Sequence, residues 1–548
     1  MRILLLILAT IPSFLFAQSR KKKALAEQQA IAAMNNTLKS HVQFLANDIL
    51  EGRRTGTHGE EMAMNYLVNQ YKLAGIAPGT DNGYVQPFDI NEGKKITDST
   101  SLIINDKVAI LNQHYFPLPY SAQKTVQSFV AMSLNEAGNI WFKDIKDLAD
   151  NNPDSVHFDA DIALKKYSVK AASKGATALI IYNSANTADD IQFNKYDTSK
   201  IASIPVIYLT KLGRDSFFSD NTAMQKVAIA VSITSNFRTG HNVVAFINNN
   251  APNTVILGAH FDHLGYGEDH NALDTGHIIH NGADDNASGT AALLELAKKL
   301  NTSQANHNNY LIIHFSAEEL GLLGSKYWLN HPTRKISPNY MINMDMVGRY
   351  DSAKKLTIGG YGTSSKWGSI FSSLTNKNLL IKFDSSGTGP SDHASFYRDS
   401  IPVLFFFTGT HPDYHKASDD WNKLNYDGER EILNYIYQLI TSADDKGKLT
   451  FSKTREASAR ANTHFKVTLG IIPDYGYTGI GVRIDGTSPG KQAEKIGLQA
   501  GDVLLQLGDY KFVDLNYYME ALGKFKKGDS TKLIIKRKGE ERVFNVQF

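Results

Sequence analysis

The chain has 548 residues, of which 42% are hydrophobic and 21% are charged, and its formal net charge is only +3. This composition is typical of several folded globular domains, and the small net charge gives no indication of a nucleic-acid partner. The sequence has no cysteine, so disulfides and thiolate metal ligands are excluded, and any metal must be held by histidines and carboxylates.

The N-terminus has the pattern of a secretory signal peptide. Arg2 precedes an apolar run from Ile3 to Phe16, which ends at Ala17. Because this run is too short for a stable membrane span, we expect residues 1–17 to be cleaved and the mature protein to be periplasmic or secreted. The alternative is an uncleaved anchor at the membrane surface. A lipoprotein is excluded because there is no cysteine to acylate.

Residues 40–75 have helical periodicity, which a glycine-rich, charged loop interrupts at residues 48–59. The expected core positions of this segment are Leu45, Ile49, Met64, Leu67, Tyr71 and Leu73. From residue 99 to residue 236 the pattern changes to short strands and polar loops, with a helical turn at 170–174 before the apolar strand Leu179–Tyr182. We expect this region to be an inserted domain.

Beyond Thr239, apolar strands alternate with helices, which predicts a doubly wound sheet with parallel strands. The expected strands are Thr254–Ala259, Tyr310–Phe315, Tyr340–Met344 and Pro402–Phe407, and the expected helices are Gly289–Leu300 and a segment from Ile432 to about Ala443. Residues 24–98 and 237–443 would together form this domain. A polar linker is expected at residues 444–462, followed by a small β-rich domain at residues 463–548.

Two segments place possible metal ligands beside the ends of predicted elements. His260 follows an apolar strand, and the carboxylate of Asp262 is a suitable acceptor for the second nitrogen of a ligating imidazole. Asp285 lies in GADDNASGT, where backbone N–H groups at a helix start can hold a carboxylate. Each segment alone has an ordinary explanation, since strand-end histidines often pack and aspartates often cap helices.

The other possible ligands also follow strands. Glu318 and Glu319 are adjacent carboxylates, which repel each other unless a cation lies nearby or one is protonated. Asp345 follows the next strand, and His415 lies in the loop after the last one. Because the carboxyl ends of strands in an open α/β sheet meet at one edge, we expect these groups to converge. Two histidines and three carboxylates, one of them shared, are sufficient for two divalent cations such as zinc.

These motifs, in this order, resemble the family of co-catalytic zinc aminopeptidases of clan MH, which includes the glutamate carboxypeptidase II and transferrin receptor branches. The resemblance covers Leu38 to about Ile440 apart from the insertion, and it implies a phosphorylase/hydrolase-like fold, a doubly wound mixed sheet with helices on both faces. It also implies a ligand set for two Zn²⁺ ions, with Asp285 bridging, His260 and Asp345 on one ion, and Glu319 and His415 on the other. The histidines at positions 263, 270, 277 and 280 are then left outside the set.

The resemblance further implies a mechanism for peptide hydrolysis. Two zinc ions would lower the pKa of a bridging water, Glu318 would take its proton, and Glu318 would then pass the proton to the leaving amine. Tyr414 matches a position that can hydrogen-bond the developing oxyanion, and aromatic packing is the equally ordinary role for it. Asp262 is placed with Glu318 and Tyr414 among the catalytic residues, whereas Asp392, in GPSDHASF, is given only a structural or supporting role.

Two accessory regions also resemble known domains. The inserted region, with KAASKGATALIIYN followed by SIPVIYLT, resembles a protease-associated (PA) domain. The C-terminal region resembles a PDZ domain, in which Leu469–Ile471 would form the carboxylate-binding loop for peptide C-termini. The implied substrates are peptides with a free N-terminus.

Three alternatives remain at this point. An inactive peptidase-like receptor is disfavoured because no ligand and no catalytic base is missing. A glutaminyl cyclase shares the fold but uses one zinc. A carboxypeptidase needs a cation for the substrate carboxylate, and Arg349 is the nearby candidate.

Overall fold

The computed structural model describes residues 10–150, 160–185, 191–269, 271–274, 276–351, 356–375, 378–454, 467–473, 479–487, 490–512 and 515–548. Residues 1–9 of the predicted signal peptide and residues 455–462 of the predicted linker lie outside these ranges. The chain divides into two compact units, Met1–Asp89 with Thr239–Phe548, and Ile90–Arg238. The second unit covers the region where we expected an insertion at residues 99–236.

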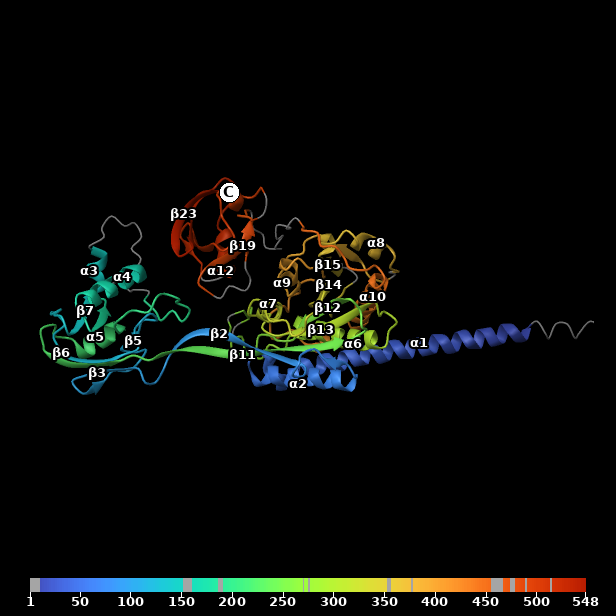
Figure 1. Cartoon of the computed structure of the whole chain (residues 1–548), viewed down its shortest axis with the longest axis horizontal. Helices are drawn as coiled ribbons and strands as arrows, with labels where there is room; N and C mark the ends of the chain where they lie inside the picture. The colour runs from blue at the N-terminus through green and yellow to red at the C-terminus, as the bar shows by residue number, and fades with distance from the viewer. Residues whose placement is uncertain are drawn as a thin grey trace, which may run out of the picture. The chain divides into compact units, whose positions relative to one another are not determined.

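The first unit contains a nine-stranded mixed sheet (Figure 1). Its strands are β1 (Ala77–Pro78), β2 (Val85–Ile96), β11 (Ile233–Ile247), β12 (Asn253–His260), β13 (Asn308–Phe315), β14 (Pro338–Met344), β15 (Leu356–Gly359), β16 (Ile381–Phe383) and β17 (Val403–Phe407). The order is β1-β11-β13-β12-β14-β17-β15-β16, with β2 paired to β11. The four central strands β13, β12, β14 and β17 are parallel, whereas β11 and β15 run antiparallel to their central neighbours.

Helices cover both faces of this sheet. They are α1 (Thr10–Leu45), η1 (Asp48–Arg53), α2 (His58–Leu73), η2 (Ala283–Ser288), α6 (Gly289–Asn301), α7 (Leu323–Asn330), η3 (Tyr361–Thr363), α8 (Trp367–Ser372), α9 (His393–Arg398), η4 (Trp421–Lys423) and α10 (Tyr426–Ala443). Strand side chains alternate between two clusters, one shared with α1, α2, α6 and α10, and the other shared with α7 and α9. The structure therefore has the mixed α/β layers that the sequence predicts.

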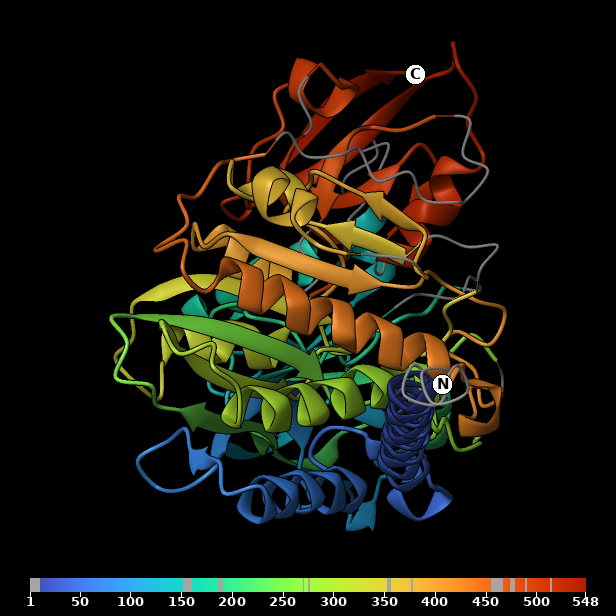
Figure 2. The same cartoon turned by 90° about the vertical axis from the view of Figure 1, so that its right-hand side faces the viewer.

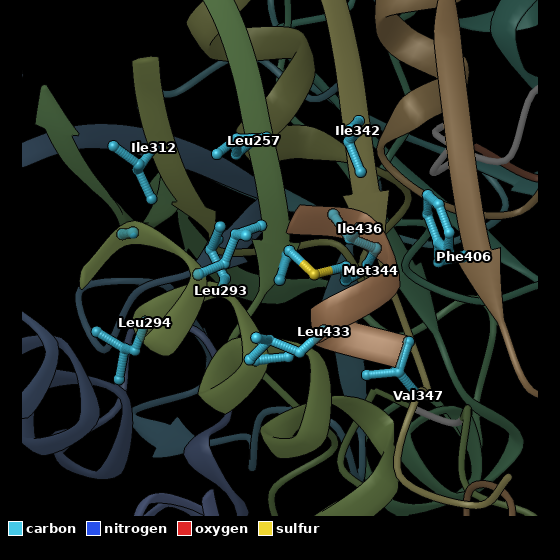
Figure 3. Close-up of a cluster of buried hydrophobic side chains, with 14 of the residues drawn as sticks. Leu257, Leu293, Leu294, Ile312, Ile342, Met344, Val347, Phe406, Leu433 and Ile436 are labelled. Atoms are coloured by element: carbon cyan, nitrogen blue, oxygen red, sulfur yellow. The ribbon is translucent and has the colours of Figure 1, made fainter. Parts of the chain in front are cut away.

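The larger core cluster is formed where α6 and α10 pack on the sheet. These helices, yellow-green and orange in Figure 2, lie side by side against the strands. Leu293 of α6 and Leu433 and Ile436 of α10 are directed toward Leu257 and Ile342 of the sheet (Figure 3), and all five are 0% exposed. Burying each such side chain stabilises the fold by about 1.5–3 kcal/mol.

Two expected core positions are wrong, because Ile49 is 58% exposed and Leu73 is 74% exposed. Ile49 lies in the 3₁₀ segment η1, where the helical period does not hold. Leu73 lies two positions beyond the buried Tyr71 of α2, and two positions correspond to about 200° around a helix. One expected boundary also differs: α10 begins at Tyr426 rather than Ile432, because the side chain of Asn425 caps its first turn.

The second unit contains two four-stranded sheets that share one hydrophobic core cluster, and a second cluster lies between one of these sheets and its helices. Its elements are β3 (Ser101–Ile104), β4 (Lys107–Val108), β5 (Tyr115–Pro117), β6 (Thr125–Val130), β7 (Ile140–Asp144), α3 (Ile145–Asp150), α4 (Ala160–Ser173), β8 (Ala178–Tyr182), β9 (Val206–Leu209), α5 (Lys211–Phe217) and β10 (Gln225–Ala230). The predicted turn at residues 170–174 is the end of the longer helix α4, and the strand Leu179–Tyr182 corresponds to β8.

The C-terminal region forms a six-stranded sheet with its own hydrophobic core. Its elements are β18 (Ile471–Pro473), β19 (Val482–Thr487), α11 (Gln492–Lys495), β20 (Val503–Leu507), β21 (Tyr510–Lys511), α12 (Leu515–Leu522), β22 (Ser530–Arg537) and β23 (Glu540–Gln547). Within the described part of this sheet, β18 is an edge strand paired with β19. Across all described residues, no helix combines the length and the apolar character needed to cross a membrane.

Candidate metal centre

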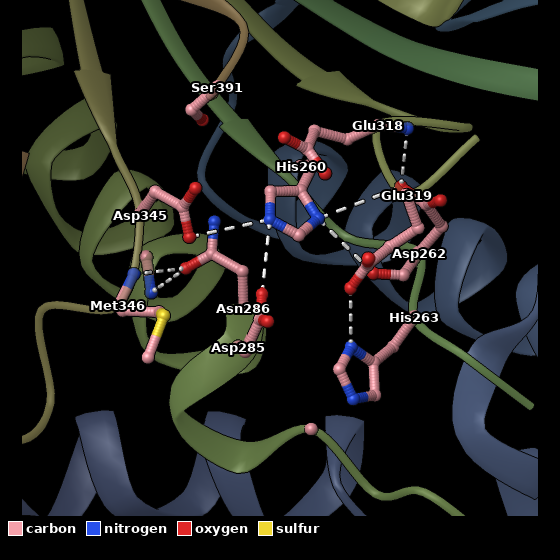
Figure 4. Close-up of polar contacts among 12 residues, drawn as sticks. His260, Asp262, His263, Asp285, Asn286, Glu318, Glu319, Asp345, Met346 and Ser391 are labelled. Atoms are coloured by element: carbon pink, nitrogen blue, oxygen red, sulfur yellow. Dashed lines mark hydrogen bonds and ion pairs between the residues drawn. The ribbon is translucent and has the colours of Figure 1, made fainter. Parts of the chain in front are cut away.

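The five predicted metal ligands meet at the carboxyl end of the central parallel strands. Figure 4 shows His260, Asp285, Glu319 and Asp345 of this set. His260 is the last residue of β12, Asp345 follows β14 directly, and Glu319 lies shortly after β13. Asp285 lies in η2, at the entry to α6, and His415 lies in the loop after β17. The parallel strand order thus brings together residues that are far apart in the sequence.

His260 is oriented by the main chain. Its Nδ1 donates to the backbone oxygen of Asp262 over 3.2 Å, so Nε2 carries the lone pair. Nε2 lies 3.3 Å from Asp285 Oδ1 and 3.4 Å from Asp345 Oδ1. The sequence predicted the carboxylate of Asp262 as the acceptor, but Asp262 Oδ1 is 3.7 Å from His260 Nδ1. That carboxylate instead accepts the backbone N–H of Glu318 over 3.1 Å and the hydroxyl of Thr55 over 3.0 Å.

His415 is held in the same way on the other side of Asp285. Its Nδ1 donates to the backbone oxygen of Asn271 over 2.8 Å, which again leaves Nε2 as the lone-pair nitrogen. Nε2 lies 3.3 Å from Asp285 Oδ2 and 3.3 Å from Glu319 Oε2. The two oxygens of Asp285 therefore face two different imidazoles.

The donor set fits two metal ions. Two ligands bound to one tetrahedral zinc at about 2.0–2.2 Å lie about 3.3–3.5 Å apart, which matches the four nitrogen–oxygen separations of 3.3–3.4 Å. His260 Nε2 and Asp345 Oδ1 are buried and lack a hydrogen-bond partner, which metal coordination would explain. Among the described residues, His260, Asp285 and Asp345 form one group able to hold an ion, and His263, Asp285 and Glu319 form a second.

Asp285 is itself held by a buried carboxylate. Asp419 Oδ2 accepts the backbone N–H groups of Asp284 and Asp285 over 2.8 and 3.1 Å. The side chain of Asp284 accepts from the hydroxyl of Ser288 and from the backbone N–H of Gly348. The hydrogen bonds to Asp419 thus hold the backbone of Asp284 and Asp285 at the entry to α6, and a cis peptide joins Asp285 to Asn286.

Glu318 and Glu319 have different environments although they are adjacent. Burial raises the pKa of Glu318 well above its usual range, and the charges of Glu319 and Asp345 act in the same direction. Burial acts in the same sense on Glu319, but the imidazoles of His415 and His263 lower the pKa of Glu319 to about 2. The pKa values of the two adjacent carboxyl groups are therefore shifted in opposite directions.

Tyr414 stacks on His415, with ring centroids 3.9 Å apart. Burial and the surrounding carboxylates raise the pKa of Tyr414 well above its usual value, so the phenol keeps its proton. Asp392 is buried at the start of α9, and burial raises its pKa to about 7.

Two further residues of this region were missed in the sequence. His263, which we placed outside the ligand set, is fully buried and hydrogen-bonds Glu319 through Nδ1 over 2.8 Å. Arg53 is also fully buried and donates to the backbone oxygens of Phe261 and Gly282. The sequence indicates these residues only by their positions. His263 lies in HFDHLG, beside a predicted ligand, and Arg53 lies in the loop EGRRTG, which interrupts the helical pattern.

Arg349, the cation considered for a substrate carboxylate, is already engaged. It forms an ion pair with Asp413 and donates to the backbone oxygen of Lys423 over 2.9 Å. A substrate carboxylate would have to compete with Asp413 for the same guanidinium.

Residues 242–440 match Peptidase family M28. The matched segment contains all five predicted ligands. Aminopeptidase YwaD of Bacillus subtilis is 26% identical over 321 residues, which cover 56% of this chain and 66% of that protein. A probable leucine aminopeptidase 2 of Aspergillus oryzae is 27% identical over 340 residues, which cover 54% of this chain and 63% of that protein. The chain thus spans just under two thirds of the length of these relatives.

Solved structures are also similar to this chain. The structure of a zinc aminopeptidase from Bacillus subtilis has 19% sequence identity and a TM-score of 0.41, and the comparison covers 77% of this chain and 96% of that one.

Proposed function

We propose that this chain is an exported two-zinc aminopeptidase that hydrolyses the first peptide bond of peptides with a free N-terminus. The observation that carries the proposal is that Asp285 lies between two imidazoles. One of its carboxylate oxygens is 3.3 Å from the lone-pair nitrogen of His260, and the other is 3.3 Å from that of His415. With Asp345 and Glu319 beside them, these groups form two ligand sets that share one carboxylate. The match of residues 242–440 to Peptidase family M28 and the similarity of the chain to proteins named as aminopeptidases support the same activity.

The chain's own residues divide the chemistry between them. The zinc ions would supply Lewis acidity to the peptide carbonyl and to the attacking water. The Glu318 carboxylate takes the proton of that water and delivers it to the nitrogen of the leaving amine. Asp262 holds Glu318 in place, because Asp262 Oδ1 accepts the backbone N–H of Glu318 over 3.1 Å. The protonated Tyr414 hydroxyl donates to the oxyanion that develops on the scissile carbonyl.

The accessory regions have proposed roles of their own. The unit Ile90–Arg238 would act as a PA-like domain that shapes access for substrates. The C-terminal region would bind peptide C-termini as a PDZ domain. The turn at Gly470, with φ 76°, directly precedes the edge strand β18, to which a peptide strand can add.

A panel of free and N-acetylated peptides tests the proposal, with the mature protein assayed in zinc, in chelator and as Glu318→Gln. A requirement for the free N-terminus, together with loss of turnover in chelator and in the variant, supports the aminopeptidase. Folded, zinc-loaded protein that binds peptide C-termini but cleaves nothing would replace this function with the inactive receptor. Cleavage from the C-terminus would instead indicate a carboxypeptidase, for which the engaged Arg349 offers no free cation.

A further inference from the structure

His263 is a buried imidazole at the metal centre for which the proposed mechanism has no use. The exposed fraction of the whole residue is 2%, and that of its side chain is 0%. Nδ1 lies 2.8 Å from Glu319 Oε1, whereas Nε2 has no hydrogen-bond partner among the described residues. Figure 4 shows the ring directed at the Glu319 carboxylate from the side away from His260. Since a carboxylate only accepts, Nδ1 carries the hydrogen and donates it.

The contact length separates a hydrogen bond from shared metal coordination. Ligand pairs at this centre are 3.3–3.4 Å apart, as expected across a tetrahedral ion. The 2.8 Å between His263 and Glu319 is shorter and is the ordinary length of an N–H···O⁻ hydrogen bond. The two oxygens of Glu319 are therefore used differently, with Oε1 held by His263 and Oε2 facing His415.

The surrounding chain is built to hold this ring. Gly282, in the left-handed conformation at φ 55°, packs on it so closely that an added Cβ would lie 2.4 Å from His263 Cδ2. The backbone oxygen of Gly282 is in turn fixed by Arg53 over 3.0 Å. Glu319 is held at a second point, because its backbone oxygen accepts from Asn271 Nδ2 over 3.2 Å.

We propose that His263 is a positioning residue for Glu319, which fixes Oε1 so that Oε2 alone is presented to the second zinc ion. This inference rests on the proposed two-zinc function and adds to it a residue that sets the zinc affinity of the site formed by Glu319 and His415. Partners that orient a ligating carboxylate typically contribute about 10–100-fold in metal affinity. His263 then acts on the metal through Glu319, without touching the substrate.

Zinc affinity of the full chain tests this role directly. Metal-free wild type, His263→Leu and His263→Asn are titrated with zinc against a competing chelator, and bound zinc is counted by mass spectrometry. We expect His263→Leu to keep the first site and to weaken the second by about 10–100-fold. His263→Asn should recover most of that loss, because its amide N–H can reach the same oxygen. His277→Leu is the matched control, since His277 lies exposed in the same loop, stacked on Tyr266.

The outcomes separate this inference from the proposed function. Wild type that binds two zinc ions, together with a His263→Leu variant of unchanged affinity, overturns the positioning role and leaves the two-zinc centre intact. Equal losses in the Leu and Asn variants also overturn it, because packing alone would then explain them. Wild type that binds fewer than two zinc ions overturns both. Thermal unfolding of the metal-free variants is compared with wild type, and a matching midpoint shows that the affinity change does not come from misfolding.

Discussion

Arg53 should be essential for the local stability of the metal centre, although it binds no metal. It is fully buried, and its guanidinium donates to four backbone oxygens, those of Leu45, Phe261, Asn281 and Gly282, over 2.5–3.0 Å. These contacts tie α1 to the segments that follow β12 and precede η2. Burial lowers the pKa of this guanidinium to about 10, although the charges of Asp262, Asp285, Asp419 and Glu319 act in the opposite direction.

The cost of Arg53→Met follows from these contacts. Each buried carbonyl left without a donor costs about 1–3 kcal/mol. Removing the guanidinium recovers the several kcal/mol needed to desolvate it, which offsets part of the sum over four carbonyls. We therefore expect the local free energy of unfolding to fall by about 2–5 kcal/mol in the metal-free protein.

Native-state hydrogen exchange measures this change in the peptides that cover residues 253–268 and 281–288. Arg54→Met is the control, because the neighbouring Arg54 forms a bidentate ion pair with Asp269 that keeps some solvent exposure, and its loss should lower protection less than the loss of Arg53. Equal protection in the Arg53→Met and wild-type proteins would refute the reasoning, since the four hydrogen bonds would then contribute nothing.

Three other expected outcomes test separate parts of the structure. Glu318→Gln should lower kcat by about 10²–10⁴-fold while both zinc ions remain bound, as measured by peptide hydrolysis and metal counting; a variant that loses zinc would contradict its role as base. Leu433→Ala should destabilise the larger unit by about 2–5 kcal/mol in urea unfolding, because it opens a cavity between α10 and the sheet, and an unchanged midpoint would speak against this packing. The hydrogen bond to Glu60 raises the pKa of His241 in the folded protein. The stability that this contact gives the fold should therefore be complete below about pH 6.5, the pKa in the unfolded chain, and should disappear as the pH rises through the higher pKa of the folded protein. The stability difference between wild type and His241→Gln should therefore shrink from pH 5 to pH 9, and a difference that grows would have the wrong sign.

The sequence predicts the central sheet well, because its strands are buried on both faces and are continuous apolar runs. The predicted strand Tyr310–Phe315, for example, lies within β13 (Asn308–Phe315), whose residues are all buried. Core positions outside the sheet are less predictable, because Ile49 lies where the helical period breaks and Leu73 lies on the far side of α2. Periodicity alone does not locate such breaks.

For the site, the sequence predicts which ionisable groups meet but not which atoms hold them. His260 and Asp345 follow strands that a parallel sheet must bring to one edge, so their convergence is a consequence of topology. The acceptor of His260 is a backbone carbonyl, and a carbonyl has no signature in the sequence. The role of Arg53 depends equally on carbonyls from three separate segments.

The fixing of both imidazoles by main-chain carbonyls affects how this centre can change over evolutionary time. The oxygens that set the tautomers of His260 and His415 belong to residues 262 and 271, and every amino acid supplies such an oxygen. Random replacement at position 271 therefore leaves the acceptor of His415 in place as long as the loop keeps its path. Orientation of these two ligands is in this respect robust to mutation, and drift in the loops around the centre can proceed without turning either ring away.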